Sequence, residues 1–176
     1  AYLGNEYQRL SGTSMASPQV AGISALVRQR IAGDPAFSGM SAKEKNAVVT
    51  NLLMGTAHPL IDVELGDGTY YSPRKVGAGA VDAVAATTAT VYPTVVGAAD
   101  TSRPKADLGD GTNGWTFQVR LTNLSDAAHT YTLGGQALSE MVEEGLFLEH
   151  SQNWAGAGIS LSFSGDGVSE AGDAQQ

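Results

Sequence analysis

The pattern of apolar and polar positions predicts helices in the first half of the chain and strands in the second half. From residue 14 to about residue 32, apolar and small residues occupy nearly every face at first, and Arg28 and Arg30 then mark where the helix emerges into water. A Gly-Asp-Pro sequence at 33–35 ends this helix. The uncharged run 11–27 also contains serine, threonine, glutamine and proline, so we expect a buried helix with its approach strand rather than a membrane span.

A second helix is predicted from Ser41 to about Gly55. The hydroxyl of Ser41 can cap this helix while the side chain of Glu44 reaches back, which is the reciprocal arrangement of a capping box. Apolar residues at four-residue spacing give the helix one buried stripe, made of Val48 with Leu52 and Val49 with Leu53.

Shorter elements flank these two helices. Residues 6–10 are predicted as a short strand that leads into a serine-containing turn. Residues 59–75 are typical of a loop or hairpin with a Gly-Asp-Gly-Thr turn at 66–69. Small residues from 80 to about 87 predict a third helix.

Beyond residue 88 the pattern becomes that of strands. Alternating apolar positions predict one half-buried strand and indicate two more. They are Trp115, Phe117, Val119 and Leu121 in the first, Tyr131 and Leu133 in the second, and Ile159, Leu161 and Phe163 in the third. Gly-Asp-Gly turns at 109–111 and 165–167 fit between strands. We therefore predict a helix-rich domain over residues 1–88 and an all-β, sandwich-like domain over residues 89–176.

The composition is that of a globular chain, with 42% hydrophobic and 16% charged residues. The chain contains no cysteine, which excludes disulfides, thiolate metal sites and a cysteine nucleophile. The formal net charge of -8 comes entirely from residues 89–176, because residues 1–88 carry equal numbers of basic and acidic side chains. We therefore expect no nucleic-acid partner. The acidic part either attracts cationic peptides or simply keeps the surface soluble.

Ser14 is the candidate for chemistry, in the run Leu-Ser-Gly-Thr-Ser-Met-Ala-Ser-Pro at 10–18. The run places this serine between a strand and a helix, where the first free amides of the helix can hold negative charge on a substrate oxygen. Gly12 allows close approach of a backbone or substrate, and Pro18 is expected in the first helical turn, which has no partner for its amide. The alternative is that Ser14 is only a small residue that helps a buried helix to pack.

Residues 12–18, Gly-Thr-Ser-Met-Ala-Ser-Pro, followed by Val-Ala-Gly at 20–22, resemble the nucleophile segment of subtilisin-like serine proteases. Downstream, Tyr-Ser-Pro-Arg-Lys at 71–75 and Gly-Ala-Gly-Ala-Val-Asp-Ala at 77–83 resemble the end of the catalytic domain in the large cell-envelope proteinases. That group includes the lactocepins and the complement-cleaving peptidases of Gram-positive bacteria. The resemblance implies a subtilisin-like α/β fold for the first part and an incomplete fibronectin type III-like domain for residues 89–176.

The resemblance also implies endopeptidase chemistry on protein or peptide substrates, through an acyl-enzyme on Ser14. In this family an aspartate, a histidine and an oxyanion-site asparagine precede the serine in that order. Residues 1–13 contain neither histidine nor aspartate, and Asn5 lies too close to Ser14 to be the oxyanion donor. We therefore expect a C-terminal fragment of such a protease that is inactive alone. Its implied location is extracellular, in the cell wall or cell envelope.

Two other functions are weighed against this one. An α/β-hydrolase, such as an esterase, also has a serine on a sharp turn, but its Gly-x-Ser-x-Gly signature is broken here by Ala16. A non-catalytic binding or adhesion module could be built on residues 89–176. However, no motif in that part indicates a ligand, and this function would leave the serine motif unexplained.

The remaining candidate residues are interpreted as structural. Three histidines, His58, His129 and His150, are predicted to lie on the surface. Three aspartates, Asp67, Asp110 and Asp166, each stand in an isolated turn without the density of oxygen ligands that calcium needs. We therefore predict no metal ion and no cofactor in this chain, and calcium in a longer protein is left open.

Other single residues have similarly ordinary interpretations. Asp82 is expected as a first-turn acid that the dipole of the third helix favours. Arg74 and Lys75 are expected to pair with a carboxylate. The tryptophans Trp115 and Trp154 are expected as core or rim aromatics.

The helix over 14–32 is also predicted as a contact surface. In a complete subtilisin-like domain this apolar helix would be covered by a parallel sheet that the 176 residues mostly lack. Burial of a side chain such as Leu26 is worth about 1.5–3 kcal/mol, so an exposed apolar helix is costly. We expect it to pack against the helix at 41–54, against the β-rich part or against a second copy, and we predict self-association through it.

Overall fold

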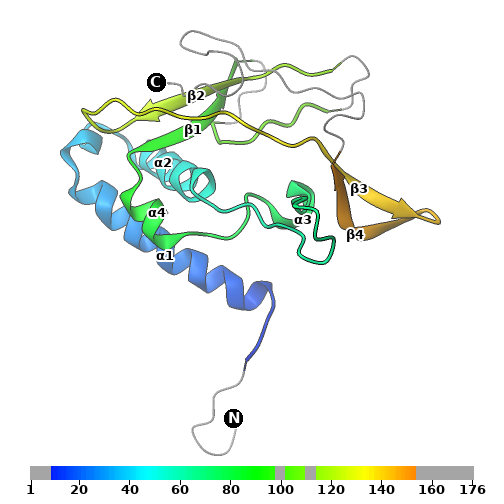
Figure 1. Ribbon diagram of the computed structural model, residues 1–176. Coiled ribbons are helices and arrows are strands. Elements are labelled where there is room, and N and C mark those ends of the chain that lie inside the picture. Colours follow the sequence, from blue (N-terminus) through cyan, green and yellow to red (C-terminus); the bar gives the residue numbers. More distant parts are fainter. Residues whose placement is uncertain (1–8, 98–101, 110–113, 154–176) are drawn as a thin grey trace, which may run out of the picture. The chain divides into compact units, whose positions relative to one another are not determined.

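The computed structural model describes residues 9–97, 102–109 and 114–153. These residues contain helices in the first part of the chain and strands from residue 91 onward, as the colours of Figure 1 show. By internal contacts the chain forms two compact units. Unit 1 consists of residues 1–56 and 81–122, and unit 2 of residues 57–80 and 123–176.

Unit 1 is built on the helices α1 (Thr13–Gly33), α2 (Ala42–Gly55) and α4 (Ala83–Thr88), with a 3-10 turn at Pro35–Phe37. The first two helices confirm the predicted spans. Apolar side chains of α1, α2, α4 and the adjoining strand meet in one core. The buried hydrophobic residues of this core are Val27, Ile31, Phe37, Val48, Val49, Leu52, Ala86, Tyr92 and Val95.

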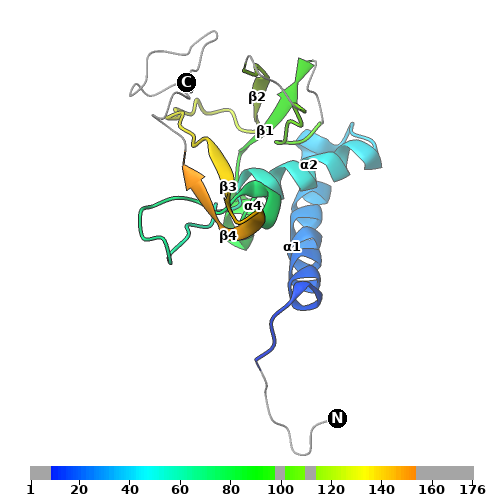
Figure 2. The same cartoon turned by 90° about the vertical axis from the view of Figure 1, so that its right-hand side faces the viewer.

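The two ends of α1 have different surroundings. Val27 and Ile31, one helical turn apart, are buried where the C-terminal half of α1 contacts α2 and α4. Figure 2 shows the N-terminal half of α1 extending beyond these two helices. Residues 9–22 are accordingly exposed, so the prediction of burial along the uncharged run 11–27 is wrong for most of its length. The described residues cover the end of the helix that carries Val27, and not the end that carries Ser14.

The start of α2 confirms the predicted capping box. The Ser41 amide donates to Glu44 Oε2 at 2.7 Å, and the Glu44 amide donates to Ser41 Oγ at 3.3 Å. The Ser41 hydroxyl also donates to the same carboxylate oxygen at 2.6 Å. The two hydrogen bonds that the carboxylate of Glu44 accepts, from the Ser41 hydroxyl and from the Ser41 amide, lower the pKa of Glu44. Two backbone amides and one side chain are therefore satisfied by residues only three positions apart.

The sheet of unit 1 pairs β1 (Val91–Val96) with β2 (Gln118–Asn123). β1 packs on α2 through the buried Tyr92 and Val95. β2 confirms a strand close to the predicted position, but its expected half-burial is wrong. Its alternating apolar residues, including Val119 at 54% exposed, remain at the surface of the described structure, because β1 is the strand of this sheet that packs on α2.

Unit 2 joins the segment 57–80 to a hairpin of β3 (Leu138–Glu143) and β4 (Leu146–Asn153). β3 and β4 are antiparallel, with an irregularity between Glu140 and Val142. The segment 57–80 contains the predicted loop 59–75. It is closed by backbone bridges between His58 and Ala80 and between Ile61 and Tyr70, and it contains the short helix α3 (Pro73–Val76).

The strand-rich part departs from the predicted pattern. β1, β3 and β4 were not expected, Tyr131 forms a single bridge rather than a strand, and the strand at 159–163 lies outside the described residues. The described strands form two separate two-stranded sheets and give no support for a fibronectin type III-like portion. The compact units also divide the chain differently from the predicted domains 1–88 and 89–176, which stay a prediction.

Candidate active site and polar cluster

Ser14 is the second residue of α1 and is exposed to solvent. The helix begins directly after Gly12, whose φ of 146° lies in the region that favours glycine. Ser14 Oγ has no hydrogen-bond partner within residues 9–97, 102–109 and 114–153. The side chain is therefore displayed at the very start of a 21-residue helix.

The backbone around Ser14 offers hydrogen-bond donors. The amides of Met15 and Ala16 both donate to the Gly12 carbonyl, at 3.0 and 3.1 Å. The amides of Thr13 and Ser14 precede the first bond of the helix, and Gly12 supplies no side-chain cap for them. Uncapped amides and the positive end of the helix dipole favour negative charge beside the Ser14 hydroxyl.

Pro18 does not lie where the sequence reasoning put it. It is the sixth residue of α1 rather than part of the first turn, and so its ring nitrogen stands where an amide would donate to the carbonyl of Ser14. That carbonyl therefore lacks its ordinary helical donor. The predicted strand at 6–10 lies outside the described residues except for Arg9 and Leu10, which are not in a strand.

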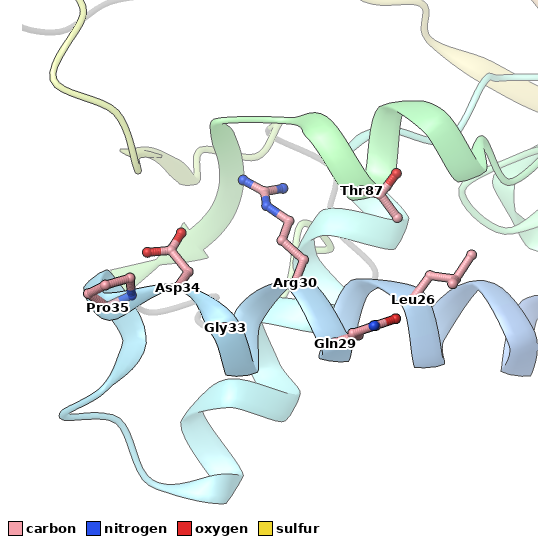
Figure 3. Close-up of a pocket in the computed structure, with 7 residues that line it drawn as sticks. All are labelled: Leu26, Gln29, Arg30, Gly33, Asp34, Pro35 and Thr87. Carbon is pink, nitrogen blue, oxygen red and sulfur yellow. The ribbon is translucent and has the colours of Figure 1, made fainter.

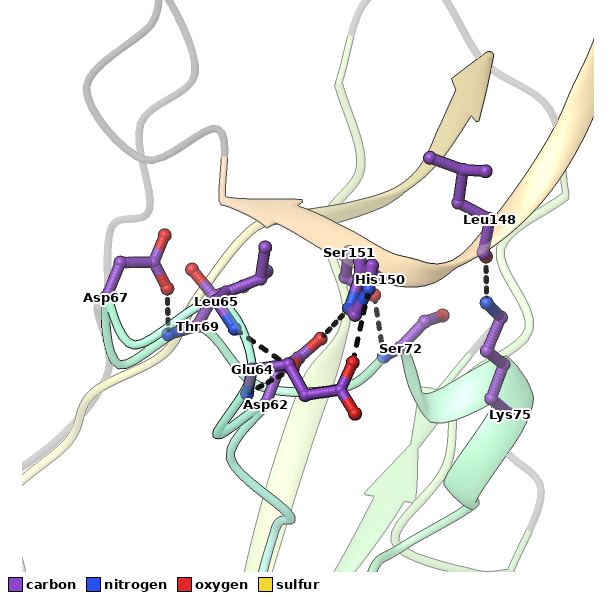
Figure 4. A network of polar contacts seen from close by, with 10 residues as sticks. All are labelled: Asp62, Glu64, Leu65, Asp67, Thr69, Ser72, Lys75, Leu148, His150 and Ser151. Atoms are coloured by element: carbon purple, nitrogen blue, oxygen red, sulfur yellow. Dashed lines mark hydrogen bonds and ion pairs between the residues drawn. The ribbon is translucent and has the colours of Figure 1, made fainter.

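A second group of polar side chains lies in unit 2, where sequence reasoning predicted only surface residues. His150 on β4 is 28% exposed, and its Nδ1 donates to Oδ2 of Asp62 at 2.6 Å, as Figure 4 shows. Asp62 is completely buried. The interpretation of His150 as an ordinary surface histidine is therefore wrong, because its ring is held by a carboxylate from a loop 88 positions earlier.

The carboxylate of Asp62 is held from several directions. Its Oδ1 accepts from the amides of Glu64 and Leu65 at 3.1 and 3.3 Å. Burial works to raise the pKa of Asp62, but the hydrogen bonds from His150 and from these two amides outweigh it, so the pKa lies below its ordinary value. A buried carboxylate that accepts three hydrogen bonds is satisfied in its charged form.

Further bonds connect the same loop to the hairpin. The Ser72 amide donates to Ser151 Oγ at 2.9 Å, and the Lys75 ammonium donates to the Leu148 carbonyl. Arg74 lies 4.0 Å from a carboxylate oxygen of Glu140, which confirms the predicted pairing of Arg74 with a carboxylate. The segment 57–80 is thus attached to both strands of the hairpin mainly through polar groups.

The remaining predicted residues have structural surroundings. His58 is exposed, as predicted, and its backbone pairs with that of Ala80. His129 lies 2.9 Å from the Ser125 hydroxyl. Asp67 confirms the turn interpretation, because its Oδ1 accepts from the Thr69 amide at 2.8 Å and this hydrogen bond lowers its pKa.

Asp82 is the N-cap of α4 rather than a residue of its first turn, and its Oδ1 accepts from the Ala85 amide at 2.8 Å. Trp115 is 54% exposed and so is not a core residue of the described structure. Asp110, Asp166 and Trp154 lie outside the described residues.

Two kinds of feature are absent from the part of the chain that the structure describes. It contains no group of three or more histidine, cysteine or acidic side chains placed to hold a metal ion. None of its helices has the length and apolar character that crossing a bilayer requires.

Comparison with known proteins shows similarity to bacterial peptidases. Residues 1–82 match the Subtilase family. A C5a peptidase from Streptococcus pyogenes serotype M1 is 33% identical over 143 residues, which cover 81% of this chain and 12% of that protein. The PII-type proteinase of Lactococcus lactis subsp. cremoris is 34% identical over 135 residues, covering 73% of this chain and 7% of that protein. The chain thus spans about an eighth or less of the length of these relatives.

Proposed function

Residues 1–82 belong to the subtilase family, and from that premise we propose that the chain is part of a secreted serine endopeptidase with Ser14 as its nucleophile. The observation that carries the proposal is the placement of Ser14, an exposed hydroxyl beside uncapped amides at the start of α1 and inside the family match. Two of the relatives are named as a peptidase and a proteinase. We extend their class of substrate, proteins or peptides, to this chain.

In the proposed reaction, Oγ of Ser14 attacks the carbonyl carbon of the scissile peptide bond and its proton passes to a histidine. An oxygen–carbon bond forms, and the carbonyl oxygen becomes an oxyanion. The Ser14 amide, at the positive end of α1, donates a hydrogen bond to that oxyanion. The carbon–nitrogen bond then breaks, the histidine returns the proton to the leaving amine, and water hydrolyses the acyl-enzyme.

The companions of Ser14 are proposed to come from other parts of a longer polypeptide. No histidine or aspartate occurs among residues 1–13, where the order Asp, His, Asn, Ser of the family would require them. We infer that the 176-residue chain does not cleave peptide bonds by itself. The small share of the relatives' length that it spans supports this inference.

The resemblance at 71–83 supports two further parts of the proposal. From it we infer a location outside the cell, in the cell wall or cell envelope. On the same resemblance alone we propose that residues 89–176 begin a fibronectin type III-like domain with an accessory role in guiding substrates rather than in chemistry.

The test uses the natural-length polypeptide that contains these residues, a fluorophosphonate probe and a peptide-cleavage assay. Ser14→Ala is expected to abolish labelling and to lower kcat/KM by about 10⁴-fold or more. Ser38→Ala, another exposed serine, is the matched control and should keep both activities. Undiminished labelling and cleavage in Ser14→Ala would overturn the proposal, as would cleavage by the 176 residues alone that depends on Ser14.

The alternative of an α/β-hydrolase, whose triad runs in the order Ser, Asp, His along the chain, can be tested separately. His150→Gln separates the candidates. The protease proposal expects labelling of Ser14 to persist in this variant, whereas loss of labelling in a folded His150→Gln protein would favour the hydrolase.

A further inference from the structure

Units 1 and 2 bury different kinds of side chain. Among the residues that the structure describes, the buried hydrophobic ones all belong to unit 1, whose surface at the C-terminal end of α1 is the shallow, open hollow of Figure 3. Apolar residues of the β3–β4 hairpin, such as Val142 and Leu146, are exposed. The buried side chains described in unit 2 are all polar: Asp62, Thr69, Ser72 and Ser151. The hairpin is therefore attached to the segment 57–80 through polar contacts rather than through an apolar core.

His150 of the hairpin lies between two carboxylates of that segment, as Figure 4 shows. Its Nδ1 is 2.6 Å from Oδ2 of Asp62, and its Nε2 is 3.7 Å from Oε2 of Glu64. An imidazolium carries a hydrogen on both nitrogens and can meet both carboxylates at once, whereas a neutral imidazole carries a hydrogen on only one. The two distances therefore favour the charged form of the ring.

The charged residues of the surrounding elements favour the same form. The acidic ones are Asp62, Glu64 and Asp67 in the segment 57–80, Glu140 and Glu143 on β3, and Glu149 on β4. The basic ones are Arg74 and Lys75 on α3, and His58 is a second histidine of the segment. Arg74 lies 4.0 Å from Glu140, and Lys75 donates to the Leu148 carbonyl. Acidic residues thus outnumber permanent cations, so a proton on His150 reduces the repulsion among carboxylates.

We propose that unit 2 contains a pH-dependent latch, which holds the hairpin to the segment 57–80 while His150 is protonated and loosens when His150 loses that proton. The neutral ring has one hydrogen for two carboxylates, so the ion pair with Asp62 and the contact with Glu64 cannot both persist. Histidine changes its charge near neutral pH, so the latch is closed on the acid side of this change and loosens as pH rises through it.

The loosening is local. The β3–β4 hairpin contributes no buried hydrophobic side chain among the described residues, so it can open without disturbing the apolar core of unit 1. At the acid end the latch requires that Asp62 is ionised, because a protonated carboxyl group cannot pair with an imidazolium. The latch does not depend on Ser14 or on peptide cleavage.

The test is hydrogen–deuterium exchange, read by mass spectrometry, on the natural-length polypeptide that contains these residues. Exchange is compared at about pH 6 and about pH 8.5, a range in which histidines change charge and carboxylates, lysines and arginines do not. Each rate is expressed relative to an unstructured peptide at the same pH. Protection of residues 138–153 should fall about tenfold or more at the higher pH, whereas protection of α2 should stay within about twofold.

Variants assign the response to one histidine. His150→Gln should show the same low protection of the hairpin at both pH values, because its side chain carries no charge to lose. His58→Gln and His129→Gln remove the other two histidines of unit 2 and should keep the full response.

A measurement on the unmodified polypeptide covers the case in which His150→Gln does not fold. The slow exchange of the carbon-bound ring hydrogen gives the titration midpoint of His150, which should lie above about 6.5 and coincide with the loss of hairpin protection. The proposal is overturned if hairpin protection is equal at the two pH values, if a folded His150→Gln protein keeps the response, or if the two midpoints differ.

Discussion

The Nδ1 atom of His150 lies 2.6 Å from Oδ2 of Asp62, and this hydrogen bond joins β4 to a loop from the family-matched part of the chain. Asp62 is fully buried, whereas the His150 ring is partly exposed. The loop 57–80 therefore depends on the hairpin for one of the three donors to its buried carboxylate.

Removal of this donor should destabilise unit 2. His150→Gln is expected to lower the midpoint of thermal unfolding by several degrees, because a buried carboxylate loses a charge-assisted partner. His129→Gln is the control, because the His129 ring lies 2.9 Å from the hydroxyl of Ser125, only four positions earlier, and its loss should change the midpoint much less. Equal midpoints for the two variants in circular-dichroism melts would contradict this role for His150.

Acid should weaken the fold through Asp62. Its pKa is lowered in the folded state, so its contribution is fully present above the ordinary value of about 3.9 and is lost as pH falls through the lowered folded value. Urea unfolding of the unmodified chain at pH values from 6 down to about 3 should show this loss. Asp62→Asn should be less stable at pH 6 and should show a flatter pH dependence in this range. A variant with the same slope as the unmodified chain would rule out Asp62 as the source.

The capping box of α2 can be measured with one substitution. Ser41→Ala should cost about 1 kcal/mol in the free energy of unfolding, because the Glu44 amide loses its acceptor. Ser38→Ala removes an exposed hydroxyl that is not a helix N-cap and should change the free energy by less than about 0.5 kcal/mol. Chemical denaturation measures the free energy of unfolding of both variants. Equal denaturation midpoints for the two variants would contradict this role for Ser41.

Two glycines of one loop test close backbone packing. Gly79 has a φ of +112°, and a Cβ atom there would overlap the backbone of His58, with which the neighbouring Ala80 pairs. Gly77 also has positive φ, at +60°, but no atom lies within 4 Å of a Cβ at that position. Gly79→Ala should therefore unfold at a clearly lower temperature than Gly77→Ala. Similar melting temperatures for the two variants would show that the loop accommodates a Cβ atom at position 79 without loss of stability.

Self-association through α1 stays a prediction, and the structure indicates which part of the helix to test. Met15, Val20 and Leu26 are exposed on α1. Sedimentation at increasing concentration should show oligomers that Val20→Lys weakens. The matched control is Val63→Lys, because Val63 is 81% exposed in unit 2. A strictly monomeric profile at high concentration, with α1 open to proteolysis, would contradict the prediction.

The features that the sequence predicted correctly are local ones. The bounds of α1 and α2, the capping box and the Asp67 turn each depend on residues within a few positions of one another. The segment around Ser14 was identified in the same way, through the resemblance of seven consecutive residues to a known motif. Its catalytic role stays a prediction.

Features that depend on distant partners were missed. β3 carries acidic residues and has no clear alternation, so only its pairing with β4 defines it as a strand. The hydrogen bond between Asp62 and His150 spans 88 positions, and neither residue stands in a motif that indicates the other. The burial predicted for the N-terminal half of α1 failed because apolar character does not specify which surface, if any, covers a helix.

The chain passes from unit 1 to unit 2 after residue 56, returns at 81 and leaves again after 122. Neither unit is therefore a cassette that recombination could exchange with a single crossover. A gene fusion that replaced everything after residue 88 would deprive Asp62 of its histidine, and one placed before residue 57 would remove α4 from its helical neighbours. The bond between Asp62 and His150 and the packing of β1 on α2 thus connect residues before position 88 to residues after it.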